Sequence, residues 1–268
     1  MKTVAIAGVG LIGGSLGFAL KKHSLVERVL GVSSPATIAS ALRLGAIDEG
    51  VSLEEAAARA DVLVLAQPIS GILRALGSLA SVRGLVTDVG STKARIVAAA
   101  AHLPGFLGGH PMAGKEARGV EAADADLFRG RTWVLTPTGH LTDADLAWRR
   151  AIETIGARVI VLDPAGHDRL VALSSHLPQL LSTALASALA DTDAHRTAGP
   201  GLQDMTRLAL SSYEIWQDIL STNEPEVRIA LDRAITALVD IRERLGEASL
   251  GETFARAQGF AERLRAKQ

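Results

Sequence analysis

Over the first 163 residues of the chain, short runs of apolar residues alternate with longer segments whose apolar residues have helical spacing. Thr3–Ala7 is a β-branched run of strand length, and Leu11–Lys22 follows it with the spacing of a helix. Further strands are predicted at Val29–Val32, Val62–Ala66, Leu85–Thr87, Phe106–Leu107, Thr132–Leu135 and Arg158–Leu162. A capping box at Thr142 and Asp145 predicts a helix that ends at Gly156. Continuous apolar strands separated by helices predict a doubly wound, mostly parallel α/β sheet.

Strand signals disappear from Pro164 onward, and nearly all of the remaining chain has helical spacing. This change places a domain boundary at Asp163–Pro164, with an α/β domain over 1–163 and an all-helical domain over 164–268. In the second domain, apolar residues recur at alternating steps of four and three, at Val227, Leu231, Ala234, Leu238, Ile241 and Leu245. This stripe is typical of a helix that packs against another helix. A bundle within one chain and a dimer of two chains explain it equally well.

The composition is that of a protein with a sizeable apolar core. A hydrophobic share of 48% with 21% charged residues excludes a disordered chain. The 28 basic and 29 acidic side chains nearly cancel, so no net charge attracts nucleic acid or an acidic membrane. The chain has no cysteine, which excludes a disulfide scaffold, thiol catalysis and thiolate zinc sites, and which fits a reducing compartment.

The uncharged stretch Thr3–Leu20 superficially resembles a signal peptide or a membrane span. It contains five glycines, however, and each glycine costs about 1 kcal/mol in a helix interior. It also has no clear cleavage site followed by a polar mature start. We therefore expect a cytoplasmic protein with no membrane partner and no nucleic-acid partner.

The segment Gly8-Val9-Gly10-Leu11-Ile12-Gly13 matches GxGxxG and lies between a predicted strand and a predicted helix. In this pattern Gly8 allows the tight turn, Gly10 lets the backbone approach a pyrophosphate, and Gly13 permits close contact between helix and strand. The N–H groups at the helix N-terminus, at Leu11 and Ile12, then face the phosphates. Because strand, motif and helix occur in the required order, the sequence predicts a dinucleotide site.

The choice of cofactor depends on the end of the second strand, where NAD sites place an acid. This chain has Ser33, Ser34 and Thr37 there and no acid, so hydroxyl groups at a helix N-terminus are free to accept a 2′-phosphate. The alternative for Ser34 is a simple helix cap before Pro35. The missing acid favours NADP over NAD, although no arginine is adjacent. Gln67, after the Val62–Ala66 strand, is also assigned to the cofactor site.

Two loops beyond the carboxyl ends of the predicted strands carry candidate chemistry. Ser91 follows the Leu85–Thr87 strand, and His110 lies in the glycine-rich loop 108–115 after the Phe106–Leu107 strand. A histidine accepts a proton near neutral pH, so His110 is a candidate base. The alternative is a histidine that bonds only its own loop. No element offers three metal ligands, so no metal site is expected.

The helical domain contributes further candidates. Arg207 lies near the start of a helix and has the side chain suited to bidentate carboxylate binding. Asp204 is three residues before it, so an ion pair between the two is the structural alternative. His176 precedes an apolar helix, where a buried core histidine is the default, and His167 with Asp168 has the pattern of a helix start.

Together these segments resemble the prephenate/arogenate dehydrogenase family of tyrosine biosynthesis. The resemblance covers GVGLIGGSLG, DVGSTK, GGHPMAGKE, LFRGRTWVLTP, SSHLPQL and GPGLQDMTRLA with YEIW, in order along most of the chain. It implies a Rossmann domain followed by a helical domain that forms an intertwined homodimer. The implied reaction is NAD(P)-dependent oxidative decarboxylation of prephenate to 4-hydroxyphenylpyruvate.

The resemblance also assigns roles to residues. It implies that His110 is the catalytic histidine bonded to the substrate hydroxyl and that Ser91 is its hydroxyl-donating neighbour. It implies that Arg207 binds a substrate carboxylate, with supporting positions at His176, Asp204 and Trp216.

Other substrates and other classes of dinucleotide-binding protein are the alternatives to this interpretation. Since the chain ends at Gln268, we expect a short form without the regulatory domain of longer relatives. Arogenate carries an ammonium group that favours a nearby acid; no spare acid is evident around Arg207, so prephenate is the expected substrate. Lysine-dependent dehydrogenases of this fold are disfavoured because no lysine occurs between Lys115 and Lys267. A non-catalytic dinucleotide-binding protein would not need His110, Ser91 and Arg207 together.

Overall fold

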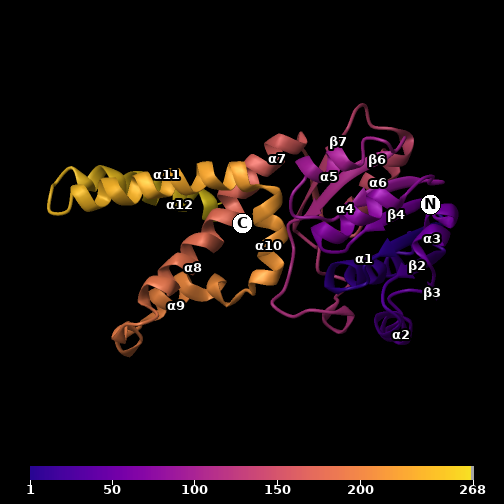
Figure 1. Ribbon diagram of the computed structural model, residues 1–268, viewed down its shortest axis with the longest axis horizontal. Coiled ribbons are helices and arrows are strands. Elements are labelled where there is room, and N and C mark those ends of the chain that lie inside the picture. The colour runs from indigo at the N-terminus through magenta and orange to yellow at the C-terminus, as the bar shows by residue number, and fades with distance from the viewer. Residues whose placement is uncertain (267–268) are drawn as a thin grey trace.

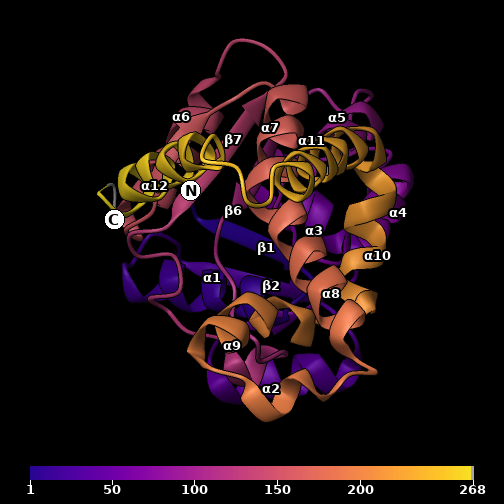
Figure 2. The same cartoon turned by 90° about the vertical axis from the view of Figure 1, so that its left-hand side faces the viewer.

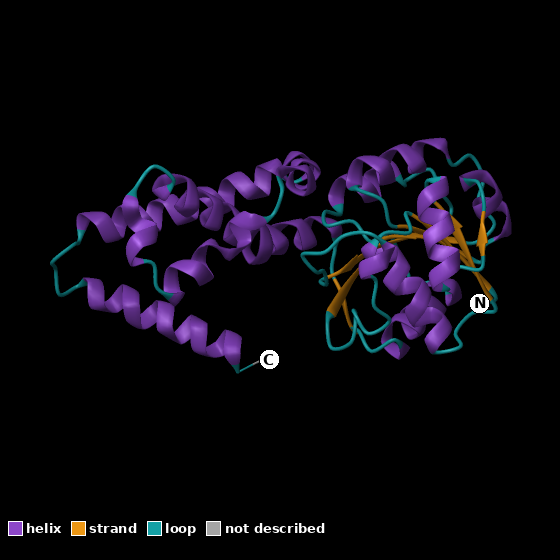
Figure 3. Cartoon of the chain, turned by 90° about the horizontal axis from the view of Figure 1, so that it is seen from below, coloured by secondary structure: helices purple, strands orange, loops and turns teal. Residues whose placement is uncertain are grey.

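The structure is a computed structural model that describes residues 1–266. Its strands all lie in one half of the molecule and the other half is helical, as Figures 1 and 3 show for these residues. The last strand is β8 (Arg158–Val161), and the helices of the second half run from α7 (Pro164–Val171) to α12 (Leu250–Arg265). Within residues 1–266, no helix has both the length and the apolar character needed to cross a membrane.

The strands form one sheet in the order β3-β2-β1-β4-β5-β6-β7-β8. Their bounds are β1 Thr3–Ala7, β2 Arg28–Val32, β3 Glu49–Gly50, β4 Val62–Leu65, β5 Leu85–Asp88, β6 Phe106–Pro111, β7 Thr132–Pro137 and β8 Arg158–Val161. Neighbouring strands are parallel except for β6 and β7. The strand order reverses between β1 and β4, where the crevice beyond the carboxyl ends holds ligands in such sheets. The predicted fold class, a doubly wound and mostly parallel sheet followed by helices, is confirmed.

Helices cover both faces of the sheet. Their bounds are α1 Leu11–Lys22, α2 Pro35–Leu44, α3 Leu53–Arg59, α4 Ile69–Ser78, α5 Ala94–Ala99 and α6 Asp143–Thr154. Side chains alternate along β1, so Ile6 packs with α1, α2 and α6 on one face, whereas Ala5 and Ala7 pack with α3, α4 and α5 on the other. Both apolar clusters are buried, and together they hold the carboxyl ends of β1 and β4 in place.

Local signals in the sequence account for several helix ends. The Thr142 hydroxyl accepts the Asp145 N–H at 3.3 Å, and the Asp145 carboxylate accepts the Thr142 N–H at 2.7 Å, which is the predicted capping box of α6. At α2 the Ser34 hydroxyl accepts the Thr37 N–H at 3.3 Å, and Pro35 occupies the first turn. Gly45 ends α2 with φ +80°, a conformation that favours glycine.

The third and sixth strands differ from the prediction. β3 is a two-residue strand that the sequence pattern does not reveal. β6 continues to Pro111, four residues beyond the predicted end at Leu107, because residues 107–111 pair with antiparallel β7. His110 therefore lies on a strand opposite Val134 and not in a loop, and this part of the prediction is wrong.

The helical half contains longer helices around a small core. Its elements are α7 Pro164–Val171, η2 Ala172–His176 (a π-helix), α8 Leu177–Leu189, η3 Asp193–Thr197, α9 Pro200–Thr206, η4 Arg207–Leu210, α10 Tyr213–Thr222, α11 Glu224–Glu243 and α12 Leu250–Arg265. α10 packs against α4 of the sheet half (Figure 2). α11 and α12 extend away from the sheet (Figure 1). Of the predicted stripe on α11, Val227 is buried, whereas Leu238 is 58% exposed.

Candidate active site

The glycine-rich turn between β1 and α1 leaves room for a ligand directly above the helix N-terminus. Gly8 has φ +99°, and a Cβ there would lie 2.6 Å from the Ala66 carbonyl carbon. A Cβ at Gly13 would overlap the Gly8 carbonyl oxygen, so helix and strand approach as the motif predicts. A Cβ at Gly10 would meet no atom within 4 Å. Gly10 is also the N-cap and provides no side-chain cap, which leaves the first N–H groups of α1 available to an anion.

Two clefts border this turn, and both are lined by Gly10, Ala66, Gln67, Pro68 and Gly119. The larger cleft, of about 540 Å³, also contains Ser91 and other residues that follow β5. The smaller cleft, of about 430 Å³, contains Ser33 and Thr37 after β2. The Gln67 side-chain oxygen between them is buried and has no hydrogen-bond partner among the described residues. A dinucleotide spanning both clefts fits this arrangement, because Gly10 leaves space and Gln67 offers an unused polar atom.

Of the three hydroxyl residues predicted to lie at the cofactor ribose, two line a cleft and one does not. Ser33 and Thr37 line the smaller cleft, whereas Ser34 caps α2 and does not line it. The capping alternative for Ser34 is therefore the arrangement observed. The smaller cleft is also lined by Glu121, from the short helix η1 (Val120–Ala122), which sequence reasoning missed.

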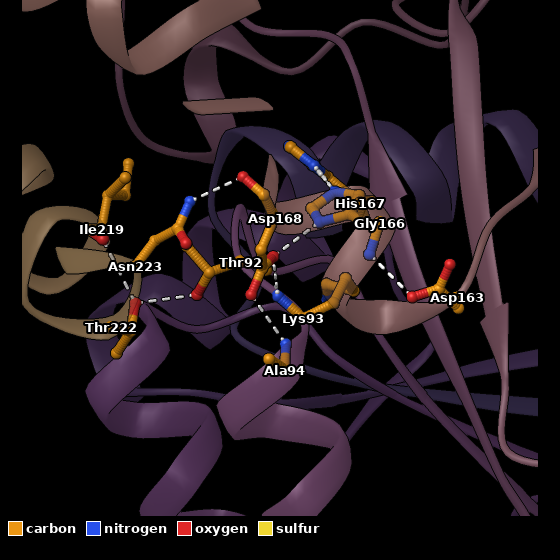
Figure 4. A network of polar contacts seen from close by, with 12 residues as sticks. Thr92, Lys93, Ala94, Asp163, Gly166, His167, Asp168, Ile219, Thr222 and Asn223 are labelled. Carbon is orange, nitrogen blue, oxygen red and sulfur yellow. Dashed lines mark hydrogen bonds and ion pairs between the residues drawn. The ribbon is translucent and has the colours of Figure 1, made fainter. Parts of the chain in front are cut away.

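His110 belongs to a buried chain of hydrogen bonds that joins the two halves of the protein. Its Nδ1 lies 2.8 Å from Nε2 of His167, and Nδ1 of His167 lies 2.7 Å from the Asp168 carboxylate. The Asp168 oxygens also accept the N–H groups of Lys93 at 2.7 Å and Ala94 at 2.9 Å (Figure 4). His110 is 8% exposed and His167 is fully buried. The alternative that His110 bonds only its own loop is wrong, because its partner lies on α7.

This chain of bonds assigns the protons of the two histidines. The Asp168 carboxylate can only accept, so Nδ1 of His167 carries a hydrogen and its Nε2 is an acceptor. His110 must then donate from Nδ1, which leaves Nε2 of His110 without a proton. Burial is the main cause that lowers the pKa of His110 well below its ordinary value of 6.5, with smaller contributions from the charged forms of His167, Lys93 and His176. Neutral His110 is thus ready to accept a proton at Nε2.

A buried ion pair fixes the backbone next to His110. Lys93 Nζ contacts the Asp88 carboxylate and donates to the Gly109 carbonyl oxygen at 2.8 Å, and both charged side chains are fully buried. The other Asp88 oxygen accepts the Gly109 N–H at 3.1 Å. Asp88 ends β5 and Gly109 lies on β6, so the pair holds these two strand ends in register at the residue before His110. Neither residue was predicted as part of the site.

His176 and Trp216 lie close together, as the resemblance implies. Their rings meet edge to face with centroids 5.9 Å apart. Asn223 donates to Nδ1 of His176 at 3.3 Å and to the Asp168 carbonyl oxygen at 2.9 Å, so His176 connects to the same network as His110. Burial is the largest cause that lowers the pKa of His176 to about 4, opposed by Asp168. His176 is therefore neutral at physiological pH.

Arg207 and Asp204 lie apart from these groups. Asp204 is on α9 and Arg207 begins η4, and both side chains are exposed. They line neither cleft, and the same is true of His110, His176 and Trp216. No ion pair joins them within residues 1–266, so the alternative of mutual pairing is not what is observed. The larger cleft instead contains two other cations, Lys115 and Arg118, from the segment that follows β6.

Comparison with known proteins places this geometry in a family. The family model for "Prephenate dehydrogenase, nucleotide-binding domain" matches residues 16–161, and the model for "Prephenate dehydrogenase, dimerization domain" matches residues 163–257. The chain belongs to the prephenate dehydrogenase family. The prephenate dehydrogenase of Bacillus subtilis is 34% identical over 257 residues, which cover 90% of this chain and 69% of that protein.

Solved structures of the prephenate dehydrogenase family superpose over nearly the whole chain. The crystal structure of the A. aeolicus enzyme in complex with hydroxyphenyl propionate and NAD+ has a TM-score of 0.89 at 30% identity, covering 98% of each chain. Synechocystis arogenate dehydrogenase has a TM-score of 0.82 at 28% identity, covering 98% of this chain and 99% of that one. The A. aeolicus complex contains NAD+.

The glycine turn and His110 are recognisable from the sequence, whereas the network behind His110 is not. His167 and Asp168 looked like an ordinary helix start, and only the packing of α7 against α5 and β7 brings them to His110. Two adjacent ionisable residues at the start of a helix carry no local signal of such a role.

Among the described residues, no group of three or more metal-binding side chains is present.

Proposed function

We propose that this chain catalyses the NAD(P)-dependent oxidative decarboxylation of prephenate to 4-hydroxyphenylpyruvate. The observation that carries the proposal is the neutral, buried His110, whose free Nε2 is fixed by the bond of Nδ1 to His167. It lies on β6, the neighbour of β5, and the segment after β5 carries Ser91 of the larger cleft, in a chain of the prephenate dehydrogenase family. A base held in one tautomer beside a hydride acceptor is what oxidation of an alcohol carbon requires.

In this reaction Nε2 of His110 takes the proton of the ring hydroxyl while the ring carbon that bears this hydroxyl loses a hydride. The nicotinamide, when bound, accepts the hydride. The carbon–carbon bond to the ring carboxylate then breaks, its electron pair completes the aromatic ring, and carbon dioxide leaves. His110 returns the proton to the ring oxygen, so atoms and charge balance. While His110 is charged, its Nδ1–H donates to His167, and the Asp168 carboxylate behind His167 stabilises the positive charge.

Other residues are proposed to bind and orient the substrate. Ser91 lines the larger cleft and supplies a hydroxyl next to the reacting group. Arg207 is assigned to a substrate carboxylate; in support of this, its guanidinium is exposed and no ion pair occupies it within residues 1–266. Asp204, His176 and Trp216 are proposed to support that site, and the contact between His176 and Trp216 favours this role.

Prephenate is favoured over arogenate because the acids of the larger cleft already have partners. Glu214 pairs with Arg118 at 3.4 Å, and the Asp218 carboxylate accepts the Ser70 N–H at 2.7 Å. An ammonium group would have to share either carboxylate with its present partner. We therefore expect a higher kcat/KM for prephenate than for arogenate.

Steady-state assays of both substrates with each cofactor test the proposal. Cofactor reduction that depends on prephenate and releases carbon dioxide supports it. A higher kcat/KM for arogenate would contradict the choice of substrate. Dinucleotide binding without turnover of either substrate would indicate a non-catalytic binding protein and would contradict the enzyme assignment.

We also propose that the chain forms a homodimer through its helical domain, consistent with the match to a dimerization domain. Large apolar side chains are exposed on the two helices that extend from the sheet: Ile229, Ile235 and Leu238 on α11, and Phe254, Phe260 and Leu264 on α12. Such a surface is unusual for a monomer, and a partner helix would bury it. The domain boundary at residue 163, the cytoplasmic location and the absence of a nucleic-acid partner stay predictions.

A further inference from the structure

The smaller cleft contains an acid that the end of β2 lacks. Hydroxyl side chains of Ser33, Thr37 and Ser40 line one side of the cleft, and Glu121 of η1 lines another. Of the described residues that line it, Glu121 is the only ionisable one. The expectation of NADP rested on the absence of an acid at this place. The acid is present but comes from a segment almost ninety residues further along the chain.

Glu121 is held at the cleft by packing that its own segment makes against α1. Val120 is buried, and a Cβ at Gly14 of α1 would lie 2.9 Å from Val120 Cγ2, so only glycine leaves room for this contact. The Ser15 hydroxyl accepts the Asp124 N–H at 2.9 Å and anchors the other end of the segment. Gly119 has φ +84°, and a Cβ there would lie 2.8 Å from the Glu121 carboxylate. The backbone that carries Glu121 is therefore fixed relative to α1 and the glycine-rich turn.

The charge of Glu121 is maintained at neutral pH. Its own backbone N–H is the largest cause that lowers its pKa, followed by a hydrogen bond from the Ser40 hydroxyl, and Arg43 adds a favourable charge. Arg43 does not line the cleft; its guanidinium lies beside Ser40 on α2, with a hydrogen bond of 3.4 Å to the Ser40 hydroxyl. The Glu121 carboxylate thus lines the cleft, whereas the Arg43 guanidinium does not.

We propose that Glu121 makes this cleft select NAD+ over NADP+. The proposal rests on the proposed function in one respect, the placement of the adenosine half of the dinucleotide in the smaller cleft. A carboxylate at this position accepts a hydrogen bond from a ribose hydroxyl and repels a 2′-phosphate. The role is the one that an acid at the end of β2 plays in other dinucleotide sites, supplied here from η1.

Calorimetric titration of the full chain with NAD+ and with NADP+, without substrate, tests the proposal. We expect NADP+ to bind at least about tenfold more weakly than NAD+, because two like charges meet near the protein surface. Glu121→Gln and Glu121→Ala should each strengthen NADP+ binding by about tenfold, and Glu121→Ala should weaken NAD+ binding because the ribose hydroxyl loses its carboxylate acceptor. Glu27→Gln is the matched control, since Glu27 is an exposed acid of the same domain that does not line the cleft.

Salt provides a second readout that a purely structural role would not produce. At 1 M salt the screening length falls to about 3 Å, so the ratio of the Kd for NADP+ to the Kd for NAD+ should decrease in the unmodified chain. Equal affinities for the two dinucleotides, or variants of Glu121 that leave the ratio unchanged, would overturn the proposal. Binding of neither dinucleotide would overturn it together with the placement of the cofactor. Normal selectivity without turnover of prephenate would overturn the proposed function alone.

Discussion

Replacing His167 by asparagine should slow catalysis without weakening substrate binding. The asparagine amide can still donate to Asp168, but it is too short to accept the Nδ1–H of His110, which now bonds to His167 at 2.8 Å. A hydrogen bond to a charged group contributes about 1.5–3 kcal/mol, and His110 is charged only during turnover. The loss predicts a fall in kcat of about 10- to 150-fold. Steady-state kinetics with prephenate measures it, with KM for prephenate expected to stay within about threefold.

His167→Gln is the matched variant, because the longer side chain can place an amide oxygen where Nε2 of His167 now accepts. It should recover much of the lost kcat, whereas a side chain needed only for folding would give two equally damaged proteins. Thermal unfolding of both variants separates the two explanations. If His167→Asn keeps kcat within twofold of the unmodified protein, the hydrogen-bond chain has no part in catalysis and the reasoning fails.

Three further predictions concern binding, assembly and pH. Arg207→Ala should raise KM for prephenate by about tenfold or more with little change in kcat, since a charge-assisted contact is lost; an unchanged KM would remove Arg207 from the site. Sedimentation at micromolar concentration should show a dimer that Leu238→Glu weakens, and a monomeric unmodified chain would contradict the helical interface. Because burial lowers the pKa of His176 to about 4, the unfolded chain takes up a proton below pH 6.5 that folded His176 does not. As the pH is lowered from 6.5 to 4, the free energy of unfolding should therefore decrease. His176→Gln should reduce the slope of this decrease by up to about 1.4 kcal/mol per pH unit. An unchanged slope would contradict the assignment of the lowered pKa to His176.

The strands of the sheet were predictable where the sequence pattern itself carries the information. The run Val62–Leu65 is buried on both faces and is apolar throughout, so its strand is evident from the sequence. The two residues of β3 are too few to show any period. The sequence predicts an end of β6 at Leu107, before its observed end at Pro111, because Gly108 and Gly109 weaken the strand signal. These glycines are required by neighbours: a Cβ at Gly108 would overlap the Thr136 hydroxyl of β7.

The candidate site was predictable only where its chemistry lies within one short segment. The turn from Gly8 to Gly13 carries its own signal, because each glycine has a separate geometric reason. His167 is 57 residues from His110 along the chain, and only the packing of α7 onto the sheet joins them. Glu121 reaches the smaller cleft through the contact of its segment with Gly14, which no local sequence pattern indicates. Arg207, assigned from the resemblance, lies outside both clefts of the single chain.

The most direct test of the account is the turnover of prephenate by His110→Asn. The asparagine amide can still donate to His167, so the fold and the hydrogen-bond chain are kept, while the nitrogen that takes the proton is removed. We predict that kcat falls by about 10²- to 10⁴-fold, with KM for prephenate and the Kd for the dinucleotide nearly unchanged. In the unmodified protein, activity should persist below pH 6.5, because the pKa of His110 is lowered and the base stays unprotonated. A variant with kcat near that of the unmodified protein would contradict the assignment of His110 as the base.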